Sequence, residues 1–137
     1  SRKLADKKNI DLILTDGPPG VGCPVIASIG GASAVLVVAE PTLSGAHDME
    51  RVIQLAKHFK VPAMVCVNKF DLNRDLTRDI EAFAKGEGLS CLGRIPFDPI
   101  FTEAMVQGQT IFEYNTGSKA GAAIRQIWEN LSKHLAL

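Results

Sequence analysis

The chain carries four short runs of apolar, mostly β-branched residues, each bounded by glycine, proline or charged residues. The runs cover residues 12–15, 34–39, 63–67 and 89–95. Segments with the 3.6-residue period of an amphipathic helix lie between them. This alternation predicts short buried strands joined by helices, which is typical of an α/β domain.

The clearest helical segment is predicted over residues 44–59, with Ser44 as its N-cap. Its apolar stripe consists of Ala46, Met49, Val52, Ile53, Ala56 and Phe59. Further helices are predicted over a short segment from Pro24 to Gly30 and over residues 75–85, 100–107 and 118–135.

The connections between the strands predict how the strands pair. No Asn-Gly or Asp-Gly turn separates two of them, and a helix joins each pair, so we expect a parallel sheet with right-handed crossovers. A fully apolar run such as residues 34–39 suits a strand covered on both faces. The predicted fold class is α/β, a Rossmann-like three-layer parallel sheet with flanking helices, formed by residues 1–137 as a single domain.

Composition narrows the function classes. Fifteen Lys and Arg balance fifteen Asp and Glu in 137 residues, so nucleic acid is not expected as the main partner. The longest uncharged run, residues 17–39, holds three prolines and five glycines, which argues against a membrane span. Three distant cysteines without CxxC spacing favour neither a disulfide framework nor a self-contained zinc site, and they indicate the reducing cytoplasm.

Polar residues follow each predicted strand, and the carboxyl ends of parallel strands meet at one edge of a sheet. The four strands lead into Asp16-Gly17-Pro18-Pro19-Gly20, Glu40-Pro41-Thr42, Asn68-Lys69-Phe70-Asp71 and Pro96-Phe97-Asp98. We therefore expect all four segments to lie on the same edge.

The first of these segments has the composition of a magnesium-phosphate site. The Asp16 carboxylate could hold Mg²⁺ through water, while the backbone N–H of Gly17 or Gly20 meets a terminal phosphate. A strand-end aspartate could equally cap a turn. Glu40 could orient the Asp16 loop or a catalytic water, or it could cap the turn that follows it.

The segment Asn68-Lys69-Phe70-Asp71 has the form NKxD, a loop that can read a purine base. The amide of Asn68 and the carboxylate of Asp71 would meet the polar edge of the base, while the Lys69 stem packs along the loop. An ordinary solvated turn is the alternative reading.

Together, the DGPPGVGCP loop, the strand ending in EPT, the VNKFD strand end and the IPFD segment resemble the MinD/ParA/Mrp family of P-loop ATPases. The similarity is greatest to members with a ferredoxin-type insertion, and it covers about residues 9–114, the C-terminal half of the family's domain. The resemblance implies Mg-ATP bound between two subunits, with iron–sulfur cluster or cofactor assembly as the wider role. It implies these site residues: Asp16 as the switch acid, Gly17, Pro18 and Gly20 in the γ-phosphate loop, Asn68 as the base contact and Pro96 in the adenine wall.

One part of the family's pattern is missing. The nucleotide loop ending GK[ST] should precede the residue 12–15 strand, and residues 88–94 only imitate its glycine spacing, with Arg94-Ile95 in place of Lys-Ser/Thr. The chain also opens without an initiator methionine. We therefore expect a part of a longer ATPase, which would not hydrolyse ATP alone and whose missing strand would favour self-association.

Other readings remain open. Cys23 could contact an iron–sulfur cluster or a redox protein in the intact protein, or it could be a small buried thiol beside Pro24. NKFD is also a signature of guanine recognition, so a GTPase is an alternative, although the spacing from Asp16 to Gly20 is one residue longer than in small GTPases. A third reading is a non-catalytic binding or electron-transfer accessory module.

Overall fold

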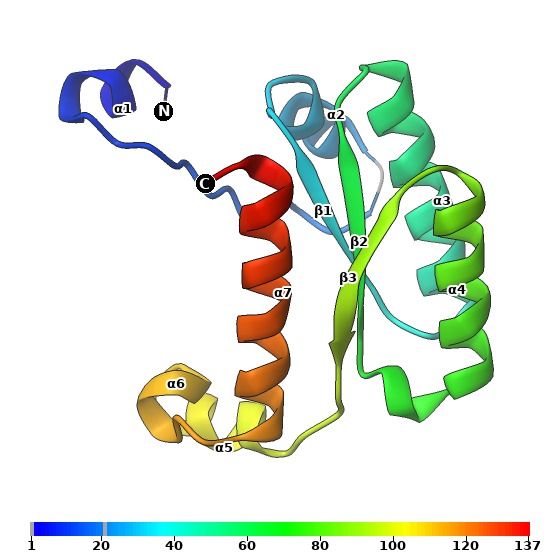
Figure 1. Ribbon diagram of the computed structural model, residues 1–137, viewed down its shortest axis with the longest axis vertical. Coiled ribbons are helices and arrows are strands. Elements are labelled where there is room, and N and C mark those ends of the chain that lie inside the picture. The colour runs from blue at the N-terminus through cyan, green and yellow to red at the C-terminus, as the bar shows by residue number, and fades with distance from the viewer. Residues whose placement is uncertain (1, 21) are drawn as a thin grey trace.

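The computed structural model describes residues 2–20 and 22–137, and Figure 1 shows how the helices and strands are arranged. In chain order the elements are α1 (Arg2–Lys8), α2 (Cys23–Gly30), β1 (Val35–Ala39), α3 (Leu43–His58), β2 (Ala63–Asn68), the 3-10 helix η1 (Phe70–Leu72), α4 (Arg74–Gly86), β3 (Ser90–Ile95), α5 (Ile100–Val106), α6 (Ile111–Tyr114) and α7 (Lys119–Leu135). No helix within the described residues is long and apolar enough to cross a membrane.

The three strands form a parallel sheet in the order β1-β2-β3. Val37 lies beside Val65 in the register of the first pair, and Val65 lies beside Cys91 in that of the second. The register then shifts, so that Cys66 lies beside Gly93. The φ of Gly93 is +154°, which residues with a side chain rarely adopt. The predicted parallel sheet is confirmed, and a glycine accommodates its irregularity.

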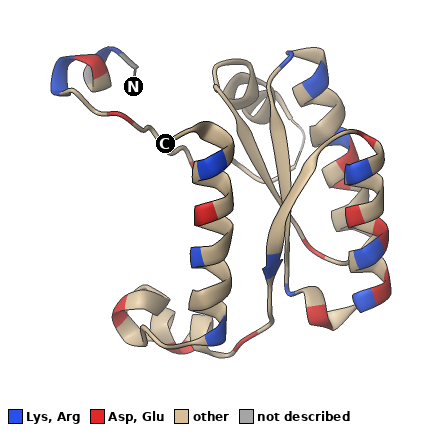
Figure 2. Cartoon of the chain, viewed as in Figure 1, with Lys and Arg blue, Asp and Glu red and all other residues tan. Residues whose placement is uncertain are grey.

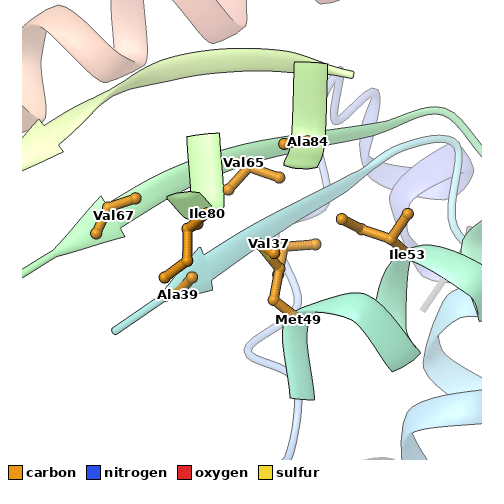
Figure 3. Packing of buried hydrophobic residues seen from close by; sticks show 8 residues of the cluster. All are labelled: Val37, Ala39, Met49, Ile53, Val65, Val67, Ile80 and Ala84. Atoms are coloured by element: carbon orange, nitrogen blue, oxygen red, sulfur yellow. The ribbon is translucent and has the colours of Figure 1, made fainter. Parts of the chain in front are cut away.

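Helices cover both faces of the sheet. On one face, α3 and α4 pack against β1 and β2, as Figure 3 shows. The buried residues of this cluster are Val37, Ala39, Met49, Ile53, Val65, Val67, Ile80 and Ala84. On the other face, α7 places Ile127 and Leu131 against Met64, Cys66 and Leu92. Alternate residues of β2 therefore enter opposite cores, which explains why the whole strand is apolar.

Helix α2 covers one end of the sheet, and the outer helices carry charges of both signs. Val25 and Ile29 of α2 pack with Ala56 of α3 and with the first residues of β1 and β2, so α2 covers the amino end of the sheet. In the view of Figure 2, acidic and basic residues are interspersed along α3, α4 and α7. This distribution agrees with the balanced composition.

The predicted helices are present, with one corrected cap. Thr42, not Ser44, caps α3: its backbone is extended, and its Oγ1 accepts a hydrogen bond from the Gly45 N–H at 2.9 Å. Ser44 already lies within the helix, where a side chain cannot cap the first turn. The short helices η1 and α6 were not predicted, although the capping box of Thr110 and Glu113 marks the start of α6.

The prediction of a strand over residues 12–15 is wrong. This segment lies in the extended connection between α1 and α2, outside the sheet (Figure 1). Its apolar side chains are solvent-exposed, with Leu14 83% exposed. Among the described residues β1 pairs only with β2, so its other edge is open. An apolar run becomes a strand only when it pairs with another strand, and residues 12–15 pair with none of β1, β2 and β3 although the edge of β1 is open.

Candidate functional site

The carboxyl ends of the three strands lie toward the lower end of the sheet in Figure 1. The residues that follow these ends in the chain are Glu40, Lys69 and Pro96. The Lys69 Nζ lies 2.8 Å from the Glu40 Oε1. Both side chains are partly exposed, so this ion pair contributes about 1 kcal/mol or less to stability. It ties the turn after β2 to the end of β1.

The turn after β2 is held by its own backbone and by one buried hydroxyl. Lys69 adopts a left-handed conformation with φ +54°, and its N–H donates to the Asn68 Oδ1 at 3.0 Å. The Leu72 N–H donates to the Lys69 carbonyl at 3.1 Å. Thr77 of α4 is fully buried, and its Oγ1 lies 2.9 Å from the Phe70 carbonyl, to which it can donate. Sequence reasoning missed Thr77, because nothing in its neighbourhood signals the contact.

Phe70 attaches the same turn to the hydrophobic core. Its ring packs against the core cluster that α3 and α4 form on the sheet. The guanidinium groups of Arg74 and Arg94 lie 5.1 and 5.5 Å from the ring centroid, within the range of a cation–π contact. Arg94 is itself paired with Glu81 of α4. The NKFD turn is thus attached to β3 and α4 as well as to β2.

Asp71 connects this turn to the segment after β3. Its Oδ1 accepts a hydrogen bond from the Phe97 N–H at 2.8 Å. One residue further on, the Asp98 Oδ1 accepts from the Ile100 N–H at 3.0 Å, at the start of α5. The structure therefore brings together the ends of β1, β2 and β3 through Glu40, the NKFD turn and residues 96–98.

The loop that begins at Asp16 is not joined to this edge. Asp16 is exposed and makes no hydrogen bond or ion pair with any other described residue. A Cβ built on Gly17 or Gly20 would meet no atom within 4 Å, so both glycines face open space. Residue 21 of this loop lies outside the described residues. The expectation that all four polar segments share one edge therefore fails for the first, because the residue 12–15 strand that should carry it is not in the sheet.

The described side chains do not assemble a metal site. Within residues 2–20 and 22–137, no group of three or more His, Cys, Asp or Glu side chains is placed to hold a metal ion. Asp16 could offer one carboxylate and Cys23 one thiolate, but neither has a second ligand from this part of the chain. A magnesium ion or an iron–sulfur cluster would need further ligands from outside the described residues.

The three cysteines occupy different environments. Cys23 is exposed at the first turn of α2, so the reading of a small buried thiol is wrong. Cys66 is buried in β2, and this burial raises its pKa from 9.0 to about 11. Cys91 is half-buried, and burial together with the nearby Glu81 raises its pKa. Cys66 thus lies in the core, and Cys91 packs against the core cluster on the other face of the sheet.

We expect a thiol reagent to distinguish these cysteines at pH 7. Cys23 should react readily because it is exposed, whereas Cys66 should react at least about a hundredfold more slowly, because burial lowers its thiolate fraction and excludes the reagent. Mass spectrometry of alkylated peptides over time measures both rates. In denaturant the two rates should converge. Equal rates in the native protein would contradict the packing of β2.

Comparisons with known proteins show which family the chain belongs to. A family model described as ParA, NUBPL iron-transfer P-loop NTPase, matches residues 3–132. The chain belongs to this ParA family of P-loop NTPases. It is 29% identical over 131 residues to the uncharacterized protein MJ0578 of Methanocaldococcus jannaschii, a match that covers 96% of this chain and 43% of the relative.

Two solved structures share the fold. The MinD cell division protein of Aquifex aeolicus superposes with a TM-score of 0.79 at 22% identity, covering 96% of this chain and 57% of that one. The septum site-determining protein MinD of Pyrococcus horikoshii, solved with Mg-ADP, gives a TM-score of 0.76 at 21% identity, covering 91% and 51%. The chain thus spans less than half of its curated relative and just over half of each solved structure. The predicted family and the partial P-loop NTPase fold are confirmed.

Proposed function

We propose that this chain supplies the base-binding part of an ATP-binding ParA-family protein. The observation that carries the proposal is the NKFD turn, which is tied to β1 by Lys69 and to the segment after β3 by Asp71. The Asn68 amide nitrogen makes no hydrogen bond with the described residues, so it can donate to a base. Pro96 would form part of the wall beside the adenine.

Adenine is the proposed base, because the P. horikoshii MinD was solved with Mg-ADP. The competing candidate is a GTPase, which the NKFD sequence itself favours. A non-catalytic accessory module is the third candidate, and the exposed, unpartnered Asp16 loop favours it for this chain alone. The ratio of the affinities for Mg-ADP and Mg-GDP, measured from amide shifts of this chain, separates the first two.

The phosphate part of the site depends on more than these residues. In the proposed site Asp16 holds Mg²⁺ through water, the backbone at Gly17, Pro18 and Gly20 meets the terminal phosphate, and Glu40 orients the water. Each of these residues is open to solvent or only partly covered. The hydrolysis of ATP is proposed for a longer protein, in which a phosphate loop and a second subunit complete the site.

The isolated chain should bind Mg-ATP very weakly, with a Kd of about 1 mM, which corresponds to about 4 kcal/mol. The base-binding edge is preformed, but no glycine-rich phosphate loop with its lysine is present in the sequence, and such a loop supplies most phosphate binding. Isothermal titration calorimetry tests this expectation. A sub-micromolar Kd would contradict it.

The location of binding can be mapped on the same chain. In ¹⁵N-labelled protein titrated with millimolar Mg-ATP, we expect the largest amide shifts at Asn68, Lys69 and Phe97. Amides around the hollow of about 510 Å³ between α3 and α4, which Arg51 and Phe83 help to line, should not move. Asn68→Ala should remove the shifts, whereas Asn130→Ala on α7 should keep them. Shifts confined to the α3–α4 hollow would contradict the proposed function.

We also expect the isolated chain to self-associate at high concentration. The open edge of β1, the 56% exposed Val38 within it and the exposed residues 12–14 present apolar surface and unpaired backbone groups. Sedimentation velocity over a hundredfold concentration range should show a rising average mass. Val38→Lys should suppress the rise, whereas Val106→Lys on α5 should not. A monomer at every concentration would contradict this expectation.

A role with iron–sulfur proteins in the cytoplasm is also proposed, and it rests on two observations. The matching family model is described as iron-transfer, and the exposed Cys23 thiol is open to a cluster or redox partner. The further ligands would come from that partner or from a second subunit. Reconstituted intact protein should lose iron when Cys23 is replaced by serine, and an unchanged iron content would remove Cys23 from the proposal.

A further inference from the structure

We propose that Asp71 is a positioning residue: its carboxylate holds the segment after β3 against the NKFD turn instead of reading the base. This inference deepens the proposed function and rests on it. Its consequence for specificity is that one of the two carboxylate oxygens that would accept from guanine is already engaged by the protein backbone. The nucleotide preference of the site therefore does not follow the guanine reading that the NKFD sequence suggests.

The first step is the placement of Asp71 itself. It lies in η1, one residue after Phe70, whose ring is packed against the core and whose carbonyl faces the Thr77 hydroxyl. The backbone that carries Asp71 is therefore held from both sides of the turn. The Asp71 residue is exposed to solvent. Its Oδ1 nevertheless accepts a hydrogen bond at 2.8 Å from the backbone N–H of Phe97, which lies 26 residues further along the chain.

The second step is what this contact fixes. Residues 96–98 join β3 to α5 and have no regular secondary structure. Asp71 holds the middle of this connection at the Phe97 N–H, and Asp98 holds its end at the Ile100 N–H. Pro96 limits the backbone of the residue before it. The connection is thus fixed beside the NKFD turn, where the base is proposed to lie.

The third step concerns hydrogen-bond capacity. Guanine offers two adjacent donors, N1–H and the N2 amino group, and a carboxylate reads them best when both of its oxygens are free to accept. The Oδ1 of Asp71 is already used by the Phe97 N–H. Adenine has no such pair of adjacent donors, because its N1 is an acceptor and only its N6 amino group can donate to a carboxylate. The Phe97 N–H therefore competes with guanine for this oxygen, which reduces the advantage that an NKxD turn would give to guanine.

Three variants of this chain test the proposal. Asp71→Ala removes the acceptor. Asp71→Asn keeps an acceptor oxygen for the Phe97 N–H but cannot accept two hydrogen bonds from guanine in the manner of a carboxylate. Asp75→Ala, which removes an exposed carboxylate paired with Arg78 in the first turn of α4, is the matched control.

The first readout needs no nucleotide. Hydrogen exchange of the Phe97 amide, followed by NMR, should accelerate about tenfold in Asp71→Ala because the amide loses its acceptor. It should stay near the wild-type rate in Asp71→Asn and Asp75→Ala. Unchanged exchange in Asp71→Ala would overturn the proposal, whatever the chain binds.

The second readout is the ratio of affinities for Mg-ADP and Mg-GDP, from amide shifts at millimolar concentrations. We expect the wild type to bind Mg-ADP at least as tightly as Mg-GDP, Asp71→Asn to leave both affinities unchanged, and Asp71→Ala to weaken both alike. A selective loss of Mg-GDP binding in Asp71→Asn would show that Asp71 reads guanine and would overturn the proposal. If neither nucleotide shifts any amide, the proposed function is wrong for this chain, and so is the inference about nucleotide preference. The hydrogen exchange of the Phe97 amide still tests whether Asp71 holds the segment after β3.

Discussion

Replacing Ile80 with alanine is expected to lower the free energy of unfolding by about 2–5 kcal/mol. Ile80 is only 1% exposed and projects from α4 toward the ends of β1 and β2, in the cluster with Ala39 and Val67 that Figure 3 shows. The substitution leaves a cavity between α4 and the sheet, beside Ala39 and Val67, and closely packed neighbours relax into such a cavity only in part.

Urea denaturation followed by circular dichroism measures this loss. Ile10→Ala is the matched control, since the same atoms are removed from a side chain that is 49% exposed, and its effect should be about 0.5 kcal/mol or less. Both experiments should be done at low protein concentration, where self-association is weakest. An equal loss in the two variants would contradict the placement of α4 on the sheet.

Replacing Gly45 with alanine is expected to cost about 1–3 kcal/mol, although alanine is ordinarily the better helix former. A Cβ at this position would lie 2.4 Å from the Glu40 carbonyl oxygen and 2.9 Å from the Thr42 Oγ1. The first of these atoms belongs to the backbone and can move only if the end of β1 moves. The substitution should therefore displace Glu40 from Lys69 and break the cap of α3.

Gly86→Ala is the control for this prediction. Gly86 is the last residue of α4, and a Cβ there would meet no atom within 4 Å. Its substitution should be neutral or should raise the free energy of unfolding by about 0.4–1 kcal/mol. In the same denaturation experiment, Gly45→Ala should therefore lower the free energy of unfolding, whereas Gly86→Ala should not lower it. A stabilised Gly45→Ala variant would show that the β1–α3 turn is looser than the structure has it.

The strands and helices that depend on local pattern could be predicted from the sequence. Each of the three strands is marked by an apolar run, and α3 is marked by an apolar stripe. These local patterns indicate which residues are buried, so the parallel sheet and its covering helices could be predicted from them. The NKFD turn could be placed at a strand end for the same reason. Local pattern was also sufficient to reject residues 88–94 as a phosphate loop, since residues 90–94 belong to β3.

Features that depend on a distant partner could not be predicted. Residues 12–15 have the composition of a strand, but whether they pair is decided by what else is in the sheet. The contact between Asp71 and Phe97 joins residues 26 positions apart. It gives the Asp71 carboxylate a structural role that the NKxD pattern alone does not indicate. The cap at Thr42 was missed for a smaller reason, because two hydroxyl residues lie near the start of α3 and only the backbone decides between them.

The central claim is that the purine base binds at the NKFD turn and the segment after β3. Photolabelling of the chain with 8-azido-ATP, followed by peptide mapping, tests it most directly. We expect the label on peptides containing Asn68 to Asp71 or Pro96 to Asp98, with its removal by excess ATP and its loss in Asn68→Ala. Label found only on α3 and α4, or label that excess ATP does not remove, would contradict the claim.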